Sequence, residues 1–272
     1  MVTTPDPVAD TERAVSLFVA GRWDECRRLI APNHAAPGYD YWWYLNLLLS
    51  RHRAAGDPGL AADAARLYVI GESHSLSAHG TEVELAGRRL RCEARWIVGC
   101  KQWHLRDGPE NFYTRRLREI AASLPPSSDV LLAIGEIDSR HDDGILRFSR
   151  RHGVPVSTGI ALTTGGYLDH LAGVMSPLGH RVVVQGVPCP TPVILDALEP
   201  ADRQALIGLL QDFNTALRQG ALARGFGFLD VHALTDDGQG ASNRLFHIDH
   251  CHLVPTGTAA AFERHFVAAG GA

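Results

Sequence analysis

Three residues that lie far apart in the sequence have the types and spacing that nucleophilic catalysis needs. Ser73 stands two residues after Gly71, which ends a short apolar run. Near the C-terminus, in the polar and histidine-rich loop 246–257, Asp249 and His252 are three residues apart. A carboxylate and an imidazole at that spacing can face the same point, so that Asp249 orients His252 while His252 deprotonates a serine hydroxyl. These three residues are the candidate catalytic triad.

Both ends of this constellation also have a plainer interpretation. Serine is a favoured N-cap residue, so Ser73 could simply cap a helix. The C-terminal loop carries four potential metal ligands within six residues, and imidazole and carboxylate groups bind Zn²⁺ and Fe²⁺. A metal site would use the cluster His247, Asp249, His250 and His252, with His74, His79 or His104 as further ligands.

The segments after residue 65 predict the sheet that must position these side chains. Apolar runs typical of strands occupy 66–71, 94–99, 129–135, 180–187 and 225–231. Helical patterns alternate with them near 109–123, 142–152, 164–175, 200–224 and 256–268. Continuous apolar strands that alternate with helices indicate a parallel sheet covered on both faces. Ligands bind beyond the carboxyl ends of such strands, and the first three predicted strands end in Gly71, Gly99 and Gly135.

The first part of the chain has a different pattern, with no convincing strand. Apolar spacing with a break at Gly21 predicts two short amphipathic helices within 11–32, and 39–56 reads as a third that Gly56 closes. A short fourth helix is expected at 59–67. We therefore expect a helical N-terminal cap over residues 1–64 and an α/β domain over residues 65–272. The paired helices resemble one tetratricopeptide unit, and they could dock a protein partner.

Composition limits the classes of function. The chain has 272 residues, 45% hydrophobic and 21% charged, with a formal charge of -4, so it offers no electrostatic case for nucleic acid or an anionic membrane. The N-terminus lacks the basic start and apolar core of a secretory signal, which predicts a cytoplasmic protein. Five cysteines without a CxxC pair are most simply free thiols. No nucleotide-binding fingerprint is present, and we expect no cofactor.

The motifs resemble those of the SGNH, or GDSL-like, hydrolases. The nucleophile block Gly-Asp-Ser of that family is matched by Gly71-Glu72-Ser73, with Glu in place of Asp, and its second block by Gly99. The last block, Asp-x-x-His before an apolar residue, is matched by Asp249-His250-Cys251-His252-Leu253. The resemblance covers roughly residues 66–268. It implies a three-layer α/β/α, flavodoxin-like fold with a five-stranded parallel sheet, and an oxyanion hole formed by the backbone N–H groups of Ser73 and Gly99.

The third block departs from the family pattern. The family has Gly-x-Asn-Asp, whose Asn donates to the oxyanion, whereas Gly135-Glu136-Ile137-Asp138 places Ile137 at that position. Losing one such donor typically costs about two to three orders of magnitude in rate. Arg140 could compensate as a charged donor, or it could form a salt bridge with Glu136 or Asp138. The residues expected to bind substrate are His74, His104, Glu136, Asp138 and Arg140.

These observations favour a serine acyl hydrolase or acyltransferase that acts on an ester or thioester of a small or carrier-bound intracellular substrate. The missing Asn motivates a second hypothesis, a non-catalytic scaffold on an SGNH-like fold whose N-terminal helices capture a partner. The third hypothesis is a metalloenzyme that uses the cluster 247–252. Fold alone does not identify a substrate.

Overall fold

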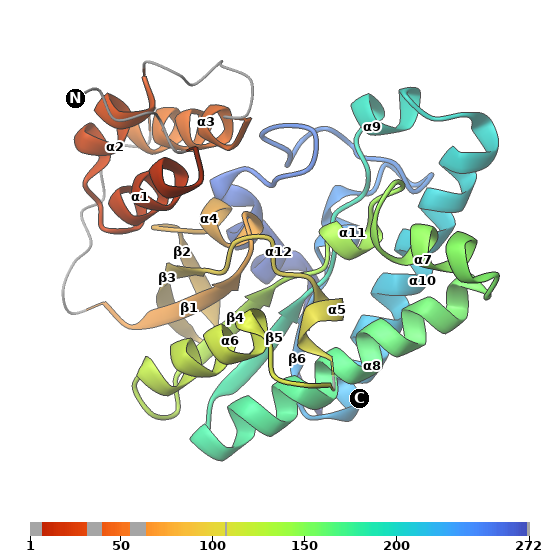
Figure 1. Cartoon of the computed structure of the whole chain (residues 1–272). Helices are drawn as coiled ribbons and strands as arrows, with labels where there is room; N and C mark the ends of the chain where they lie inside the picture. Colours follow the sequence, from red (N-terminus) through yellow and green to blue (C-terminus); the bar gives the residue numbers. More distant parts are fainter. Residues whose placement is uncertain (1–6, 32–39, 55–63, 107, 271–272) are drawn as a thin grey trace. The chain divides into compact units, whose positions relative to one another are not determined.

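The computed structural model describes residues 7–31, 40–54, 64–106 and 108–270, and it divides the chain into two compact units, residues 1–64 and 65–272. The N-terminal unit contains helices α1 (Pro7–Val19), α2 (Trp23–Ile30) and α3 (Asp40–Ala54) (Figure 1). Gly21 adopts a positive φ of 71° in the turn between α1 and α2, as the predicted break requires. Phe18 and Trp42 are buried in this unit. Most of the expected fourth helix, 59–67, lies outside the described residues.

The α/β unit is built on one mixed sheet. In the described residues this sheet has seven strands in the order β2-β3-β1-β4-β5-β6-β7. Strands β3, β1, β4, β5 and β6 are parallel, and β2 and β7 are antiparallel edge strands. Their bounds are β1 Arg66–Gly71, β2 Glu82–Leu85, β3 Arg88–Trp96, β4 Asp129–Ala133, β5 Arg181–Gln185, β6 Gly227–Leu229 and β7 Phe266–Val267.

The sequence predicts five strands, and the sheet has two more than predicted. Strand β2 forms a hairpin with β3 across Ala86 and Gly87, which have φ values of 52° and 71°. Two consecutive residues with positive φ suit a tight hairpin turn. Strand β2 alternates exposed glutamates with buried apolar residues, so it lacks the continuous apolar run that predicts the other strands. The strand expected at 94–99 consequently begins at Arg88 and ends at Trp96.

Helices cover both faces of the sheet. One core joins alternate strand residues such as Ile70 and Leu132 to the helices α6, α8 and α10, and the other joins Val69 and Leu131 to α11 and α12 (Figure 1). The helices of this unit are α4 His74–Ser77, α5 Gln102–Leu105, α6 Phe112–Ser123, η1 Ile137–Ser139, α7 Gly144–His152, α8 Val156–Met175, η2 Ser176–Leu178, α9 Pro192–Asp196, α10 Pro200–Ala223, α11 Val231–Thr235 and α12 Pro255–His265.

The carboxyl ends of β1 and β4 meet because a glycine permits close contact. Gly71 pairs with Ala133, and a Cβ built on Gly71 would lie 2.1 Å from the Ala133 carbonyl oxygen. A side chain at this position would therefore push the strands apart. The segment after β1, which carries Ser73, and the segment after β4, which carries Glu136, leave the sheet side by side.

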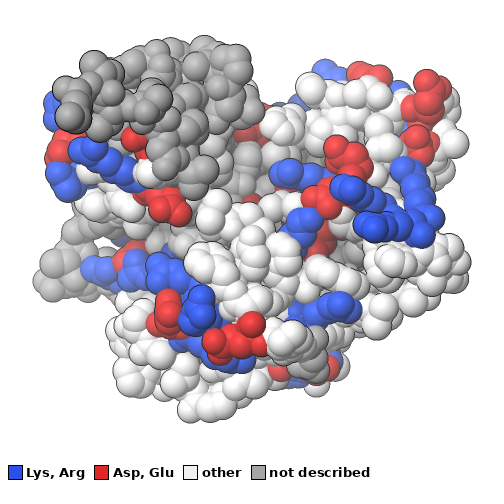
Figure 2. All heavy atoms as spheres, viewed as in Figure 1, with Lys and Arg blue, Asp and Glu red and all other residues white. Residues whose placement is uncertain are grey.

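Charged side chains of both signs are interspersed on one face of the described residues. Figure 2 shows one face, on which Lys and Arg side chains lie beside Asp and Glu side chains instead of gathering into a patch of one sign. Among the helices that the structure describes, none combines the length and the apolar composition needed to cross a membrane.

Candidate active site

Ser73 lies between the end of β1 and the start of α4. It occupies the N-cap position of this four-residue helix, yet its side chain makes no capping hydrogen bond to the helix backbone. Its Oγ instead lies 2.7 Å from His252 Nε2, and its hydroxyl also lies 2.7 Å from Glu72 Oε2, to which it can donate. Ser73 Oγ therefore lies within hydrogen-bond distance of both the imidazole and the Glu72 carboxylate.

Asp249 holds His252 in place through the loop before α12. Its Oδ1 accepts hydrogen bonds from the backbone N–H groups of Cys251, at 2.9 Å, and His252, at 2.7 Å. Its Oδ2 lies 2.7 Å from His252 Nδ1. The backbone N–H of Ile248 donates to the His252 carbonyl at 2.9 Å and closes the loop. Ser73, His252 and Asp249 therefore form a continuous hydrogen-bonded chain.

The ionisation states of Asp249 and His252 suit proton transfer from Ser73. Burial is the largest single effect and opposes the charged form of Asp249, but the hydrogen bond and charge of His252, together with the backbone N–H bonds, outweigh it and lower the pKa of the carboxyl. Burial lowers the pKa of His252, although Asp249 partly counteracts it. A neutral His252 with its proton on Nδ1 presents the Nε2 lone pair to Ser73, as a general base must.

A second ion pair lies directly beside the serine. Glu72 is 1% exposed and His74 is 4% exposed. Oε1 of Glu72 lies 2.8 Å from His74 Nδ1, and His74 Nε2 lies 3.1 Å from the Cys251 carbonyl oxygen. Burial opposes both charges, but each partner stabilises the other, so the pKa of Glu72 falls to about 2 and the pKa of His74 rises to about 9. Charged His74 therefore neutralises the carboxylate that touches Ser73.

The residues expected to form the oxyanion hole lie on neighbouring strands. Gly99 is exposed in the turn after β3, with a φ of 60°, and β3 pairs with β1 so that Trp96 lies opposite Gly71. Ile137 begins the 3₁₀ helix η1 after β4 and has no side-chain donor. The roles of Ser73 and Gly99 as backbone donors remain predictions.

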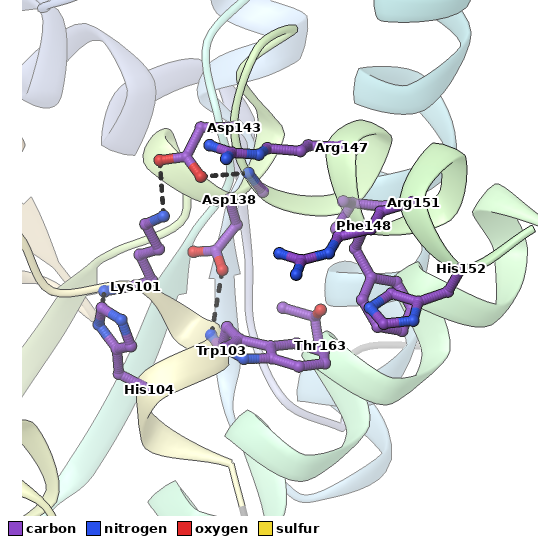
Figure 3. Close-up of a pocket in the computed structure, with 12 residues that line it drawn as sticks. Lys101, Trp103, His104, Asp138, Asp143, Arg147, Phe148, Arg151, His152 and Thr163 are labelled. Carbon is purple, nitrogen blue, oxygen red and sulfur yellow. Dashed lines mark hydrogen bonds and ion pairs between the residues drawn. The ribbon is translucent and has the colours of Figure 1, made fainter. Parts of the chain in front are cut away.

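The five residues expected to bind substrate separate into three places. His74 belongs to the ion pair with Glu72. Arg140 forms a salt bridge with Glu136 through Nε and Nη2, at 3.0 and 2.7 Å, which is the plainer of the two roles considered for it. Glu136 and Arg140 line a pocket near the triad. His104 and Asp138 line a separate cavity, shown in Figure 3, where the Asp138 carboxylate accepts backbone N–H bonds of 2.7 and 3.0 Å.

The pocket near the triad, here called the β5 pocket, has a volume of about 360 Å³. Glu136, Arg140, His250 and Cys251 line its polar side, and Cys251 directly precedes His252 in sequence. Its apolar side is formed by residues that come after β5 in the sequence: Val187, Pro188, Pro190, Ile194, Leu198 and Leu206. The volume lies within the range of small-molecule sites.

A metal ion would compete with existing hydrogen bonds for the nitrogen and oxygen atoms that could bind it. The ligand atoms of His74, Cys251 and His252 lie within 4.8 Å of one another, as do those of Asp249, His250 and Cys251. Both ring nitrogens of His252 already bond to Asp249 and Ser73, and both nitrogens of His74 bond to Glu72 and a carbonyl. Burial raises the pKa of the Cys251 thiol, which weakens it as a ligand. A metal would have to displace the hydrogen bonds of the triad.

Sequence reasoning missed the contact between Glu72 and Ser73. Glu72 was seen only as a substitute for the Asp of the family block, although an acidic residue just after a buried strand and two residues before a histidine was a signal for a buried pair. The β5 pocket was also missed, because its apolar side, within residues 187–210, meets a polar side that comes from the distant segments 136–142 and 250–251.

No protein-family model and no curated protein sequence matches the chain. Among solved structures, it is similar to a GDSL-like lipase from Bacteroides thetaiotaomicron, with 16% identity, 73% of this chain and 86% of the lipase covered, and a TM-score of 0.48. An acetyl xylan esterase from Geobacillus stearothermophilus has 17% identity, 74% and 93% coverage, and a TM-score of 0.45. An extracellular lipase from Streptomyces rimosus has 17% identity, 74% and 99% coverage, and a TM-score of 0.42. The structural neighbours of this chain over most of its length are GDSL-like lipases and esterases with the SGNH hydrolase fold.

Proposed function

We propose that the chain is a serine-dependent acyl hydrolase or acyltransferase that acts on an ester or thioester. The observation that carries this proposal is the hydrogen-bonded chain from Ser73 Oγ through His252 to Asp249, with 2.7 Å at both links. A serine that touches an oriented, neutral imidazole is the arrangement that activates a hydroxyl for attack on a carbonyl.

In the proposed reaction, His252 Nε2 takes the proton of Ser73 as Oγ attacks the carbonyl carbon. Backbone N–H groups of Ser73 and Gly99 donate to the oxyanion that forms. The intermediate collapses when His252 returns the proton to the leaving oxygen or sulfur, which leaves an acyl group on Ser73. Water or a second acceptor then loses a proton to His252, attacks the acyl carbon and releases the product, and Ser73 regains its proton.

Glu72 adds a step that a simple triad lacks. The serine has one hydroxyl proton and two acceptors at 2.7 Å, Glu72 Oε2 and His252 Nε2. Attack requires the proton to point at His252, so the hydroxyl must turn away from Glu72. His74 makes this turn less costly, because its positive charge weakens Glu72 as an acceptor.

The β5 pocket is proposed to hold the acyl chain. Its apolar wall suits a hydrocarbon, and the contact of Cys251 with His252, at 3.5 Å from Sγ to Nδ1, places its polar end beside the triad. Glu136 and Arg140, already paired, would bound the mouth of the pocket.

Hydrolysis of p-nitrophenyl esters from acetate to octanoate, and of matching acyl thioesters, tests the proposal. The variants Ser73→Ala and His252→Ala should lose the activity. Ser123→Ala, which removes an exposed hydroxyl at the end of α6, should retain it. Activity that survives both triad changes would end the proposal.

A further inference from the structure

A second cavity lies among α5, η1, α7 and α8 and shares no lining residue with the β5 pocket. Its volume is about 310 Å³. Figure 3 shows that side chains from these elements converge on it. The lining residues that matter here are Trp103, Asp138, Arg147, Phe148, Arg151 and Thr163.

Two arginines give this cavity an excess of positive charge. Arg147 and Arg151 are four residues apart in α7, and both guanidinium groups point toward the cavity in Figure 3. No carboxylate among the described residues forms an ion pair with either of them, whereas Arg150 of the same helix pairs with Asp202 at 2.6 Å. Asp143 at the rim bonds to Lys101 Nζ at 2.6 Å and to the backbone N–H of Gly144 at 2.7 Å, and the charge of Arg147 contributes less than these to lowering the pKa of Asp143.

A buried hydroxyl in the wall has no partner. The Thr163 side chain is 0% exposed, and no described residue accepts or donates a hydrogen bond to its Oγ1. Its neighbour Thr164 bonds back to the Ile160 carbonyl at 2.9 Å, as threonine in a helix commonly does. Figure 3 shows the Thr163 hydroxyl directed to the side where Arg151 lies. Because buried polar groups are nearly always satisfied, this hydroxyl indicates a polar ligand atom.

Asp138 does not cancel this attraction for anions. Both of its oxygens accept backbone hydrogen bonds, from Gln102 and Trp103. Burial raises the pKa of Asp138 to about 7 despite these bonds, so a nearby anion can be accommodated by protonation of the carboxyl.

Aromatic rings form the remaining wall. The rings of Trp103 and Phe148 lie 5.1 Å apart, and the Arg106 guanidinium covers Trp103 at 3.4 Å from the ring centroid. Such a wall packs against a planar or apolar body.

We propose that this cavity binds an organic phosphate, with the phosphoryl group held by Arg147, Arg151 and Thr163 and the organic body placed against Trp103 and Phe148. A phosphoryl group fits better than a carboxylate because it offers three terminal oxygens, and two guanidinium groups with one hydroxyl offer donors for all three. The site is separate from the triad, so the proposal stands independently of the acyl chemistry.

Calorimetric titration of the full chain with phenyl phosphate tests this assignment, with inorganic phosphate and phenol as comparison ligands. We expect saturable binding of phenyl phosphate that is tighter than binding of inorganic phosphate, and no binding of phenol. Arg151→Gln and Arg147→Gln should each weaken binding at least about tenfold, and Thr163→Val about threefold. The control Arg150→Gln removes the same charge from the same helix outside the cavity and should change affinity less than twofold.

Circular dichroism of each variant establishes that α7 is intact. Absence of saturable binding to the wild type, or equal affinity of the wild type, Arg151→Gln and Arg150→Gln, would overturn the proposed site. Equal affinity for phenyl phosphate and inorganic phosphate would overturn the role given to Trp103 and Phe148.

Discussion

The buried ion pair of Glu72 and His74 beside Ser73 predicts a loss of stability whose size follows from the pKa of His74. His74→Asn removes the imidazole charge but keeps an amide N–H near the position of Nδ1, which lies 2.8 Å from Glu72 Oε1. Burial opposes the charge on His74, yet Glu72 raises its pKa from 6.5 to about 9. Each tenfold change in an acid dissociation constant is worth about 1.4 kcal/mol, so the charge on His74 stabilises the fold by roughly 3 kcal/mol.

The pH dependence of this stabilisation has a definite sign. A group whose pKa is higher in the folded than in the unfolded chain stabilises the fold fully below its unfolded pKa. For His74 the contribution is present below pH 6.5 and is lost as the pH rises through about 9. We therefore expect the loss of unfolding free energy in His74→Asn to be larger at pH 6 than at pH 10, by roughly 3 kcal/mol.

Urea denaturation followed by circular dichroism at the two pH values measures this difference. The control His152→Asn changes an exposed histidine at the end of α7 and should alter the unfolding free energy by less than about 0.5 kcal/mol. If His74→Asn lost the same free energy at pH 6 and pH 10, the ionised pair with Glu72 would be refuted.

Three further predictions concern catalysis on p-nitrophenyl esters. Asp249→Asn places an amide N–H where Oδ2 accepts from His252 Nδ1, which favours the tautomer of His252 without a proton on Nδ1. We therefore expect kcat to fall by about 10⁴, whereas the exposed control Asp212→Asn should keep its activity. The profile of kcat/KM against pH should lose activity on the acid side with a midpoint below pH 6.5, because burial lowers the pKa of His252, and a midpoint above 6.5 would contradict this lowering. Ile194→Trp should fill the β5 pocket and lower kcat/KM for the octanoate ester at least about tenfold more than for the acetate ester, and equal losses would remove the pocket as the acyl site.

Local sequence patterns were enough to single out three side chains that lie together in the structure. Ser73 was found because a buried strand and a glycine precede it, and Asp249 and His252 because they share one turn. The structure brings these three side chains to hydrogen-bond distance. Parallel strands that end at one edge of a sheet converge there, so residues after them can be paired before the structure is known.

Features that depend on tertiary contacts could not be predicted in this way. The edge strand β7 has two residues, too few for a periodic pattern, and it follows α12 directly. The cavity of Arg151 and Thr163 forms only when α7 packs against α8, and the sequence alone does not tell which hydroxyl is left without a partner. Arg140 was recognised as a candidate, but only the structure shows that Glu136 is its partner.

The proposed mechanism requires Ser73 to be an activated nucleophile, and intact mass after exposure to a fluorophosphonate probe tests this without knowledge of the substrate. Such a probe reacts with a serine that a neighbouring base deprotonates. We predict one adduct on the wild type and on Ser123→Ala, and none on Ser73→Ala or His252→Ala. An absence of adduct on the wild type, or an adduct that persists on Ser73→Ala, would contradict the proposed triad of Ser73, His252 and Asp249.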